Sequence, residues 1–119
     1  IDFLKKKGVE IHVRSIFLQG LYNQPVIQFP SNFSSEFVEH HNRSLKFAKE
    51  LNLSLSELSL FFLSKQKNLD VIIVGCSSLS RLKDFQNKWN KVINSNIDIN
   101  FEKYSWNLSE LELDPRQWN

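Results

Sequence analysis

The sequence is poor in the residues that define several protein classes. Its 119 residues include one cysteine, no methionine, three glycines and three prolines. A single cysteine, Cys76, permits no disulfide within the chain, which indicates a reducing, cytoplasmic setting. No internal repeat or low-complexity segment is present, and 119 residues suffice for one domain with a real core. Such a chain is nevertheless short for a complete α/β barrel of about 250 residues.

Long apolar runs and a dominant charge are also lacking. No stretch approaches the about 20 apolar residues needed to span a bilayer, and the first residues have no signal-peptide pattern. Fifteen basic and thirteen acidic residues give a net charge of +2, spread in mixed sign along the chain. We therefore expect neither a membrane nor nucleic acid as a partner. The chain starts with Ile1 rather than methionine, which suggests a piece of a longer protein.

The first third of the chain predicts a helix end, a strand and a long loop. Residues 1–7 read as the end of a helix that Gly8 closes. Residues 9–14 alternate apolar and polar side chains, as in a short strand. His12 in this strand has no second ligand at metal-binding spacing, so we interpret it as structural. Residues 15–31 form a connection much longer than a usual βα loop, which is typical of a binding loop or lid.

Two helices are predicted next. The first begins at Ser31 or Asn32 and ends near residue 51, because apolar positions recur at steps of three and four. His40 and His41, adjacent residues of this helix, point about 100° apart and therefore cannot share a metal. We expect them at the surface and the edge of the core. The second helix starts at a capping box, residues 54–57, and has a wide apolar face.

Residues 70–85 combine a predicted strand with a predicted helix start. Residues 71–74 are continuously apolar and β-branched, as in a parallel strand buried on both faces. Gly75 lets the backbone turn, and Ser77 and Ser78 are both suitable N-caps for the helix that follows. A helix N-terminus favours anions such as phosphate, and Arg81 would add a guanidinium group. The alternative is an ordinary serine-capped turn that binds nothing.

The predicted elements form two consecutive βα units, which implies a parallel pairing of the two strands. Beyond about Asn94 the periodicity is lost. The last part is polar with scattered aromatic residues that would pin it to a surface, namely Phe101, Tyr104, Trp106 and Trp118. We therefore divide the chain into residues 1–95, with the βα units, and an irregular tail, residues 96–119.

Three stretches together resemble one enzyme family. VRSIFLQGL (13–21) and VGCSSLSRLKD (74–84) resemble the segments that follow the last two barrel strands of aldo-keto reductases. The intervening ELNLSLSEL (50–58) is also similar to the segment that separates those strands. The resemblance covers about residues 1–95. It implies an α/β fold in which the chain is the C-terminal portion of a (β/α)8 barrel of the TIM type.

The resemblance also implies an NADP site. After the seventh barrel strand, Ser15, Ile16, Phe17 and Gln19 would line the pyrophosphate and ribose path of NADPH, and after the eighth strand Gly75, Ser77, Arg81 and Asp84 would hold the 2′-phosphate end. The chain departs from many members at Ile16, at the shorter Asp84, and at Phe85, where the family has an asparagine that meets adenine. Phe85 would either stack on adenine or face the core.

Our first hypothesis is therefore a C-terminal fragment of an NADPH-dependent aldo-keto reductase, a carbonyl and alcohol oxidoreductase acting on a small carbonyl substrate. The family's catalytic Tyr, Lys, Asp and His belong to earlier strands, so the chain by itself is expected to be inactive. One alternative is a half-barrel binding or assembly module without catalysis, and another is an unrelated phosphate-binding βα module. Open strand edges make self-association an expectation in either of the first two cases.

Overall fold

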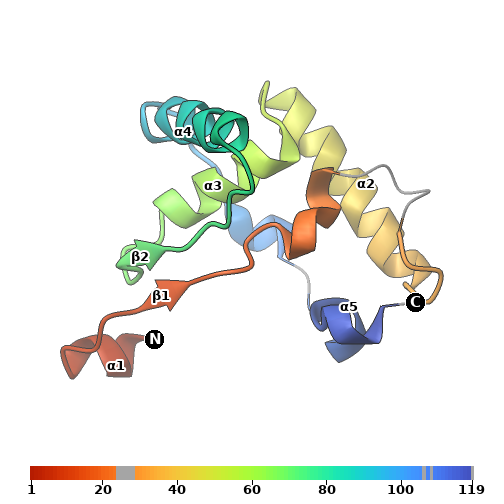
Figure 1. Ribbon diagram of the computed structural model, residues 1–119, viewed down its shortest axis with the longest axis horizontal. Coiled ribbons are helices and arrows are strands. Elements are labelled where there is room, and N and C mark those ends of the chain that lie inside the picture. Colours follow the sequence, from red (N-terminus) through yellow and green to blue (C-terminus); the bar gives the residue numbers. More distant parts are fainter. Residues whose placement is uncertain (24–28, 106, 108, 119) are drawn as a thin grey trace. The chain divides into compact units, whose positions relative to one another are not determined.

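The computed structural model describes residues 1–23, 29–105, 107 and 109–118. In chain order its elements are α1 (Asp2–Lys6), β1 (His12–Val13), the 3-10 helix η1 (Leu18–Asn23), α2 (Ser35–Glu50), α3 (Leu55–Ser64), β2 (Val71–Ile72), α4 (Leu79–Ile93), η3 (Phe101–Tyr104), α5 (Glu110–Leu113) and η4 (Pro115–Gln117) (Figure 1). This mixture of helices with a short parallel sheet confirms the α/β class. Within the described ranges, no helix has the length and apolar character needed to cross a membrane.

The chain forms two compact units, and each unit takes two separate segments of the sequence. Unit 1 contains Ile1–Ile16 and Glu57–Asn96, and unit 2 contains Phe17–Ser56 and Ile97–Asn119. The boundary that the sequence suggests at residue 95 lies next to the last crossing between units. The chain also passes from one unit to the other after residues 16 and 56, where the sequence predicts no boundary.

The sheet of unit 1 pairs β1 with β2 in parallel, as predicted. The register places His12 opposite Val71 and Val13 opposite Ile72. Just beyond β2, the amide of Ile73 donates to the carbonyl of Val13 at 2.8 Å, which continues the ladder by one hydrogen bond. Both strands are shorter than residues 9–14 and 71–74 predict, because hydrogen bonding joins them only over this short stretch.

The prediction that residues 71–74 are buried on both faces was wrong. None of the four is buried, and Ile73 is 49% exposed. Burial on both faces requires a layer of packing on each side of a parallel sheet. In the register of this sheet, Ile73 and the exposed His12 lie on one face, while the half-buried Val13 and Ile72 lie on the other.

An ion pair ties α1 to the start of β2. Lys5 Nζ lies 2.6 and 2.7 Å from the two carboxylate oxygens of Asp70, and the amide of Ile11 also donates to Asp70 at 2.7 Å. The hydrogen bond from Lys5 is the main reason why the pKa of Asp70 lies below its ordinary value. Gly8 follows α1 with φ of +73°, which confirms the predicted left-handed helix end.

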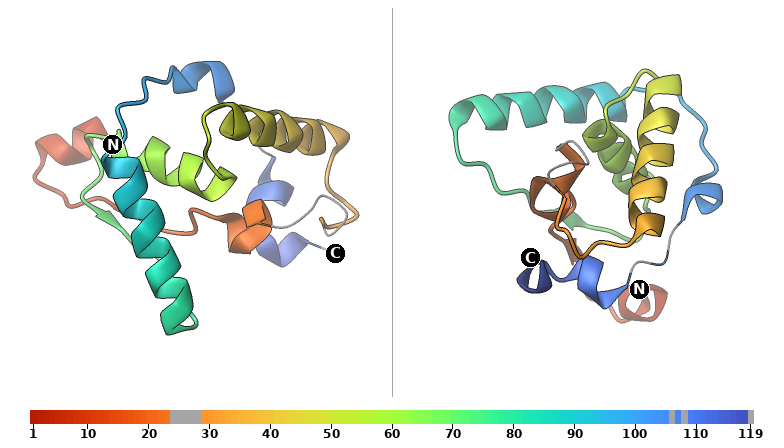
Figure 2. Two further views of the ribbon diagram at one scale, coloured as in Figure 1. Left: turned by 90° about the horizontal axis from the view of Figure 1, so that it is seen from above. Right: turned by 90° about the vertical axis from the view of Figure 1, so that its right-hand side faces the viewer.

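Helices α3 and α4 supply the core of unit 1. Figure 2 shows α4 as one continuous helix. Val92 on α4 and Phe61 on α3 are fully buried, and Lys91 of α4 contacts the Glu57 carboxylate of α3 at 2.9 Å. Other apolar residues of α4 are less buried, since Leu82 is 41% and Ile93 is 47% exposed.

Helix α2 belongs to unit 2. Its N-cap is Ser34, whose side chain accepts from the amide of Phe37, so the helix starts three to four residues later than predicted. Phe37, His41 and Ala48 are buried, which confirms the predicted stripe. The prediction that His41 lies at the surface or the edge of the core was wrong: it is 2% exposed, and its ring lies 4.7 Å from that of Phe29. Burial lowers the pKa of His41, which favours the neutral imidazole that an apolar core tolerates.

The C-terminal tail belongs to unit 2 and packs on the rest of this unit through aromatic rings, as predicted. Tyr104 stacks on Phe47 with ring centroids 3.8 Å apart, and Trp118 meets Phe33 edge-on at 5.4 Å. The tail is less irregular than expected, since it contains η3, α5 and η4. Trp106, also predicted to pin the tail, lies outside the described residues, as do residues 24–28 of the predicted binding loop.

Candidate anion-binding site at the β2–α4 turn

The turn between β2 and α4 ends in a serine cap. Ser78 has extended backbone angles, and its side chain accepts a hydrogen bond from the amide of Arg81 at 3.2 Å. Its carbonyl accepts from the amide of Leu82 at 3.1 Å. Of the two serines that the sequence offers as caps, Ser78 is therefore the one that begins the helix, while Ser77 is exposed in the preceding bend.

The first turn of α4 is electropositive. The amides of Leu79 and Ser80 have no acceptor in the described part of the chain, because the first amides of a helix lack intrahelical partners. Arg81 is exposed, and its guanidinium group has no hydrogen-bond or ion-pair partner on the described residues. Free amides, the positive end of the helix dipole and a guanidinium group together suit an anion such as a phosphate.

Gly75 does not play the part that the sequence suggests. Its φ lies outside the left-handed region, and a Cβ at this position would have no neighbouring atom within 4 Å. The interpretation that the turn needs a glycine to avoid a Cβ clash was therefore wrong. Gly75 is exposed, and a side chain at this position would extend into open space.

Asp84 lies one turn further along α4. Its carboxylate contacts the ammonium group of Lys88 at 2.7 Å, an i,i+4 pair along the helix. A carboxylate accepts hydrogen bonds and repels phosphate, so Asp84 suits a hydroxyl or amino group of a ligand rather than its phosphate. Both side chains stay accessible to solvent, which limits the strength of this pair.

Ser15 and Ile16 follow β1 as Gly75 and Ser77 follow β2. Because β1 and β2 are parallel, both pairs of residues lie at the same end of the sheet, where the carboxyl ends of the strands are. Ser15 has φ of 59°, a left-handed conformation that is uncommon for a residue other than glycine. The predicted site residues of unit 1 therefore share one end of its sheet and the first turns of α4.

Phe17 and Gln19, the other two predicted site residues, belong to unit 2. Gln19 lies within η1 with φ of 54°, beside Leu18 with φ of 43°. Two successive non-glycine residues in the left-handed region indicate local strain. Six of the eight predicted residues are thus placed in one unit, and these two in the other.

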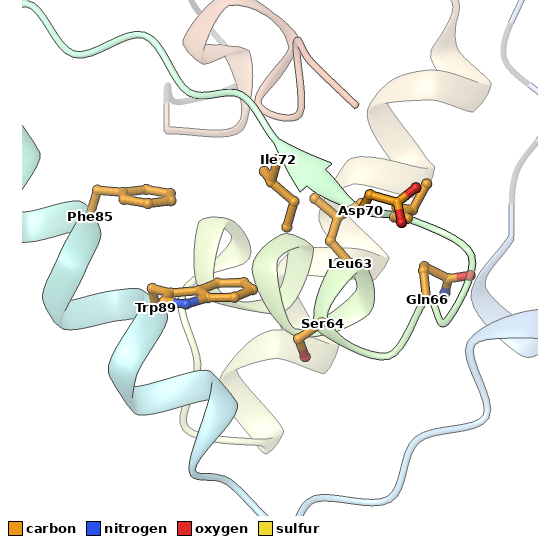
Figure 3. A pocket seen from close by; sticks show the side chains of 8 residues that line it. Leu63, Ser64, Gln66, Asp70, Ile72, Phe85 and Trp89 are labelled. Atoms are coloured by element: carbon orange, nitrogen blue, oxygen red, sulfur yellow. The ribbon is translucent and has the colours of Figure 1, made fainter. Parts of the chain in front are cut away.

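Phe85 faces a pocket on the inner side of α4. Figure 3 shows Phe85 and Trp89 projecting from α4 toward Ile72 on β2 and Leu63 on α3. The pocket has a volume of about 390 Å³. Its lining consists of Leu63, Ser64, Gln66, Leu69, Asp70, Ile72, Phe85 and Trp89. Phe85 is half-buried and lines this pocket, whereas none of the eight predicted site residues does.

Other chemistry is sparse on the described residues. They hold no group of three or more His, Cys, Asp or Glu side chains that could bind a metal ion. Cys76 is an exposed free thiol in the turn before α4. Compared with protein-family models, with curated proteins and with solved structures, the chain gives no significant match.

Proposed function

We propose that the chain forms the cofactor phosphate-binding part of an NADPH-dependent aldo-keto reductase, as the last two βα units of a (β/α)8 barrel. The observation that carries this proposal is the first turn of α4, which offers free amides and a guanidinium group on Arg81 without a partner on the described residues, and which the turn of residues 73–78 connects to the parallel strand β2. Barrels of this type often bind phosphate with the loops after their last two strands and a helix N-terminus. The 2′-phosphate of NADP carries the charge that such a site selects.

The arrangement at the carboxyl end of the sheet supports the same proposal. Ser15 and Ile16 follow β1 at this end, and Gly75 and Ser77 follow β2. The residues expected along the pyrophosphate and ribose and those expected at the 2′-phosphate therefore start from neighbouring strands. We assign the 2′-phosphate to Arg81 and to the amides of Leu79 and Ser80. Asp84, already paired with Lys88, would accept from a hydroxyl or amino group.

Catalysis would belong to the parent enzyme. Hydride transfer to a small carbonyl substrate needs a positioned proton donor, and no residue of this chain corresponds to the family's catalytic set. We therefore expect cofactor binding without turnover from the 119-residue chain. A half-barrel assembly module is the second candidate, and the strand edges of unit 1 that the described residues leave without a partner favour it.

The test compares NADP⁺ with NAD⁺ in Arg81→Ala, by calorimetric titration of the 119-residue chain. We expect the variant to bind NADP⁺ about tenfold or more weakly, because it loses a charge-assisted hydrogen bond. Its affinity for NAD⁺, which lacks the 2′-phosphate, should stay nearly unchanged. The matched control is Lys83→Ala, which removes the same charge from α4 about 200° further around the helix.

Two outcomes would contradict the assignment. Equal losses of NADP⁺ and NAD⁺ affinity in Arg81→Ala would mean that Arg81 does not contact the 2′-phosphate. An equal loss of NADP⁺ affinity in Lys83→Ala would mean that only the general positive charge of α4 attracts the nucleotide.

A further inference from the structure

Strand β1 has one edge that the described residues leave open. Its pairing with β2 uses the carbonyls of Ile11 and Val13, which accept from the amides of Val71 and Ile73. Backbone groups alternate in direction along a strand, so those of the even-numbered residues Glu10, His12 and Arg14 point away from β2. No other described segment forms a backbone hydrogen bond with these three residues.

The side chains of the same three residues share one face of the sheet. His12 Nε2 lies 3.0 Å from the carboxylate of Glu10, two residues away along the strand. Glu10, His12 and Arg14 are all exposed. The intervening Ile11 and Val13 are half-buried on the opposite face. The open edge therefore carries an acidic and a basic residue placed symmetrically about one histidine.

We propose that this edge binds a second copy of the chain, through antiparallel pairing of β1 with itself about a two-fold axis at His12. In this register His12 lies opposite His12 of the second copy. Glu10 of each copy lies opposite Arg14 of the other, so the dimer contains two Glu10–Arg14 pairs. Because these are the residues whose backbone groups face the open edge, they form the hydrogen-bonded pairs of the antiparallel ladder. The result is a four-stranded sheet with β1 of each copy at its centre.

Charge complementarity selects this register. Directly opposite side chains lie on the same face about 5 Å apart, so both Glu10 carboxylates meet an Arg14 guanidinium group. A shift of the second copy by two residues in one direction places His12 opposite Glu10 and leaves Arg14 without an opposite charge. A shift in the other direction places His12 opposite Arg14 and leaves Glu10 without one. On the other face, Ile11 of one copy lies opposite Val13 of the other, an apolar pair.

A two-fold axis also closes the assembly. Pairing β1 of one copy with β2 of another is a head-to-tail contact that can repeat without limit, whereas pairing β1 with itself uses the same surface on both copies and is complete in a dimer. Residues 71–74 on the β2 edge have no charged side chain that could fix a register. The inference uses only the edge of β1 and does not depend on a bound nucleotide.

The test measures the dimerisation constant of the 119-residue chain by sedimentation equilibrium at micromolar concentrations. We expect a dimer for the unmodified chain. Glu10→Arg places arginine opposite Arg14 twice, and Arg14→Glu places glutamate opposite Glu10 twice. Like charges opposite each other across strands are destabilising, so each variant should dimerise about tenfold or more weakly. The variant with both substitutions restores opposite charges and should dimerise nearly as well as the unmodified chain.

Mixing the two single variants shows whether each of them has kept its fold. One variant then has arginine at both positions and the other has glutamate at both, so the mixture should form a heterodimer. Glu39→Arg, an exposed glutamate of α2, is the control for the charge change and should leave dimerisation unaltered. A monomer at all concentrations, or single variants that dimerise normally, would overturn the proposal. A dimer lost only when residues 71–74 are changed would assign the contact to β2 instead.

Discussion

Glu112 is a buried carboxylate, 3% exposed, that joins the starts of two helices in unit 2. One of its oxygens accepts from the hydroxyl of Ser34, the N-cap of α2, at 2.6 Å. The other accepts from the amide and the hydroxyl of Ser109, the N-cap of α5, at 3.0 and 2.8 Å. Burial by itself raises the pKa of Glu112, but the hydrogen bonds from Ser34 and Ser109 outweigh burial, so its pKa lies below the ordinary value of 4.5.

We predict that Glu112→Gln lowers the free energy of unfolding at pH 7 by about 1.5–3 kcal/mol, because it replaces charge-assisted hydrogen bonds by neutral ones. A carboxyl group with a lowered pKa stabilises the fold above its unfolded-state pKa, and this contribution is lost as the pH falls through the folded-state value. The difference in free energy of unfolding between the unmodified chain and Glu112→Gln should thus be largest above about pH 5 and should shrink in more acidic solution.

Urea unfolding at several pH values measures this difference. Glu110→Gln is the matched control, because Glu110 is an exposed glutamate of the same short helix. It should change the free energy of unfolding by less than about 0.5 kcal/mol. Equal effects of the two substitutions, or a Glu112 effect that does not depend on pH, would show that the hydrogen bonds to Ser34 and Ser109 do not stabilise the fold.

At the scale of single residues, the sequence reveals local partners and misses distant ones. Ser78 and Ser109 cap the helices that follow them, and serine before a helix is a recognisable local signal. Lys5 and Asp70 are 65 positions apart, and Ser34 and Glu112 are 78 apart. Nothing in one sequence indicates which of many polar residues such a distant group will meet, because the tertiary fold decides it.

At the scale of elements, the cap of α4 yields a prediction. Ser78→Ala removes the acceptor for the amide of Arg81, so we expect the free energy of unfolding to fall by about 0.5–2 kcal/mol. Ser77→Ala is the control, because Ser77 is the adjacent exposed serine and makes no cap contact. Chemical unfolding followed by circular dichroism measures both. A larger loss in Ser77→Ala than in Ser78→Ala would contradict the observed start of α4.

The helices were easier to predict than the strands. Helix α2 repeats its apolar residues over sixteen positions, so its stripe identifies Phe37 and Ala48 as core residues. The strands offer only a few residues each, and their burial depends on what covers the sheet. The apolar residues 71–74 therefore predicted a fully buried strand, whereas Ile73 is about half exposed. Their parallel pairing could be predicted, because two helices lie between them in the sequence.

The candidate site was predictable only in part, for the same reason. The serine cap and Arg81 follow from the local sequence of the β2–α4 turn. The division of the eight predicted residues between two units depends on how the whole chain folds, and neither Phe17 nor Gln19 signals that it belongs with α2. The pocket beside Phe85 likewise needs α3, β2 and α4 in place.

At the scale of the whole molecule, the barrel of the proposed parent enzyme and the dimer of the 119-residue chain would need the same edge of β1. Every strand of a complete barrel has a neighbour on both sides, so a preceding barrel strand would occupy the edge that a second copy binds in the 119-residue chain. Pairing with an upstream strand and pairing with a second copy therefore exclude each other. The anion site at α4 lies on a different element and is compatible with either arrangement.

The last prediction concerns truncation after Asn96, which removes the C-terminal segment of unit 2. In unit 2 this truncation removes Tyr104, which stacks on Phe47, and Trp118, which meets Phe33 edge-on. It also removes Glu112, whose carboxylate accepts from the N-cap of α2. Unit 1 contains none of the removed residues. Each aromatic pair contributes about 0.5–1.5 kcal/mol beyond its burial, so protection of the α2 amides against hydrogen exchange should fall about tenfold or more. The amides of the β1–β2 ladder serve as the control within the same sample and should keep their protection. If the α2 amides were equally protected in the truncated chain, the tail would not be part of the core of unit 2, and the stacking of Tyr104 on Phe47 would contribute nothing to its stability.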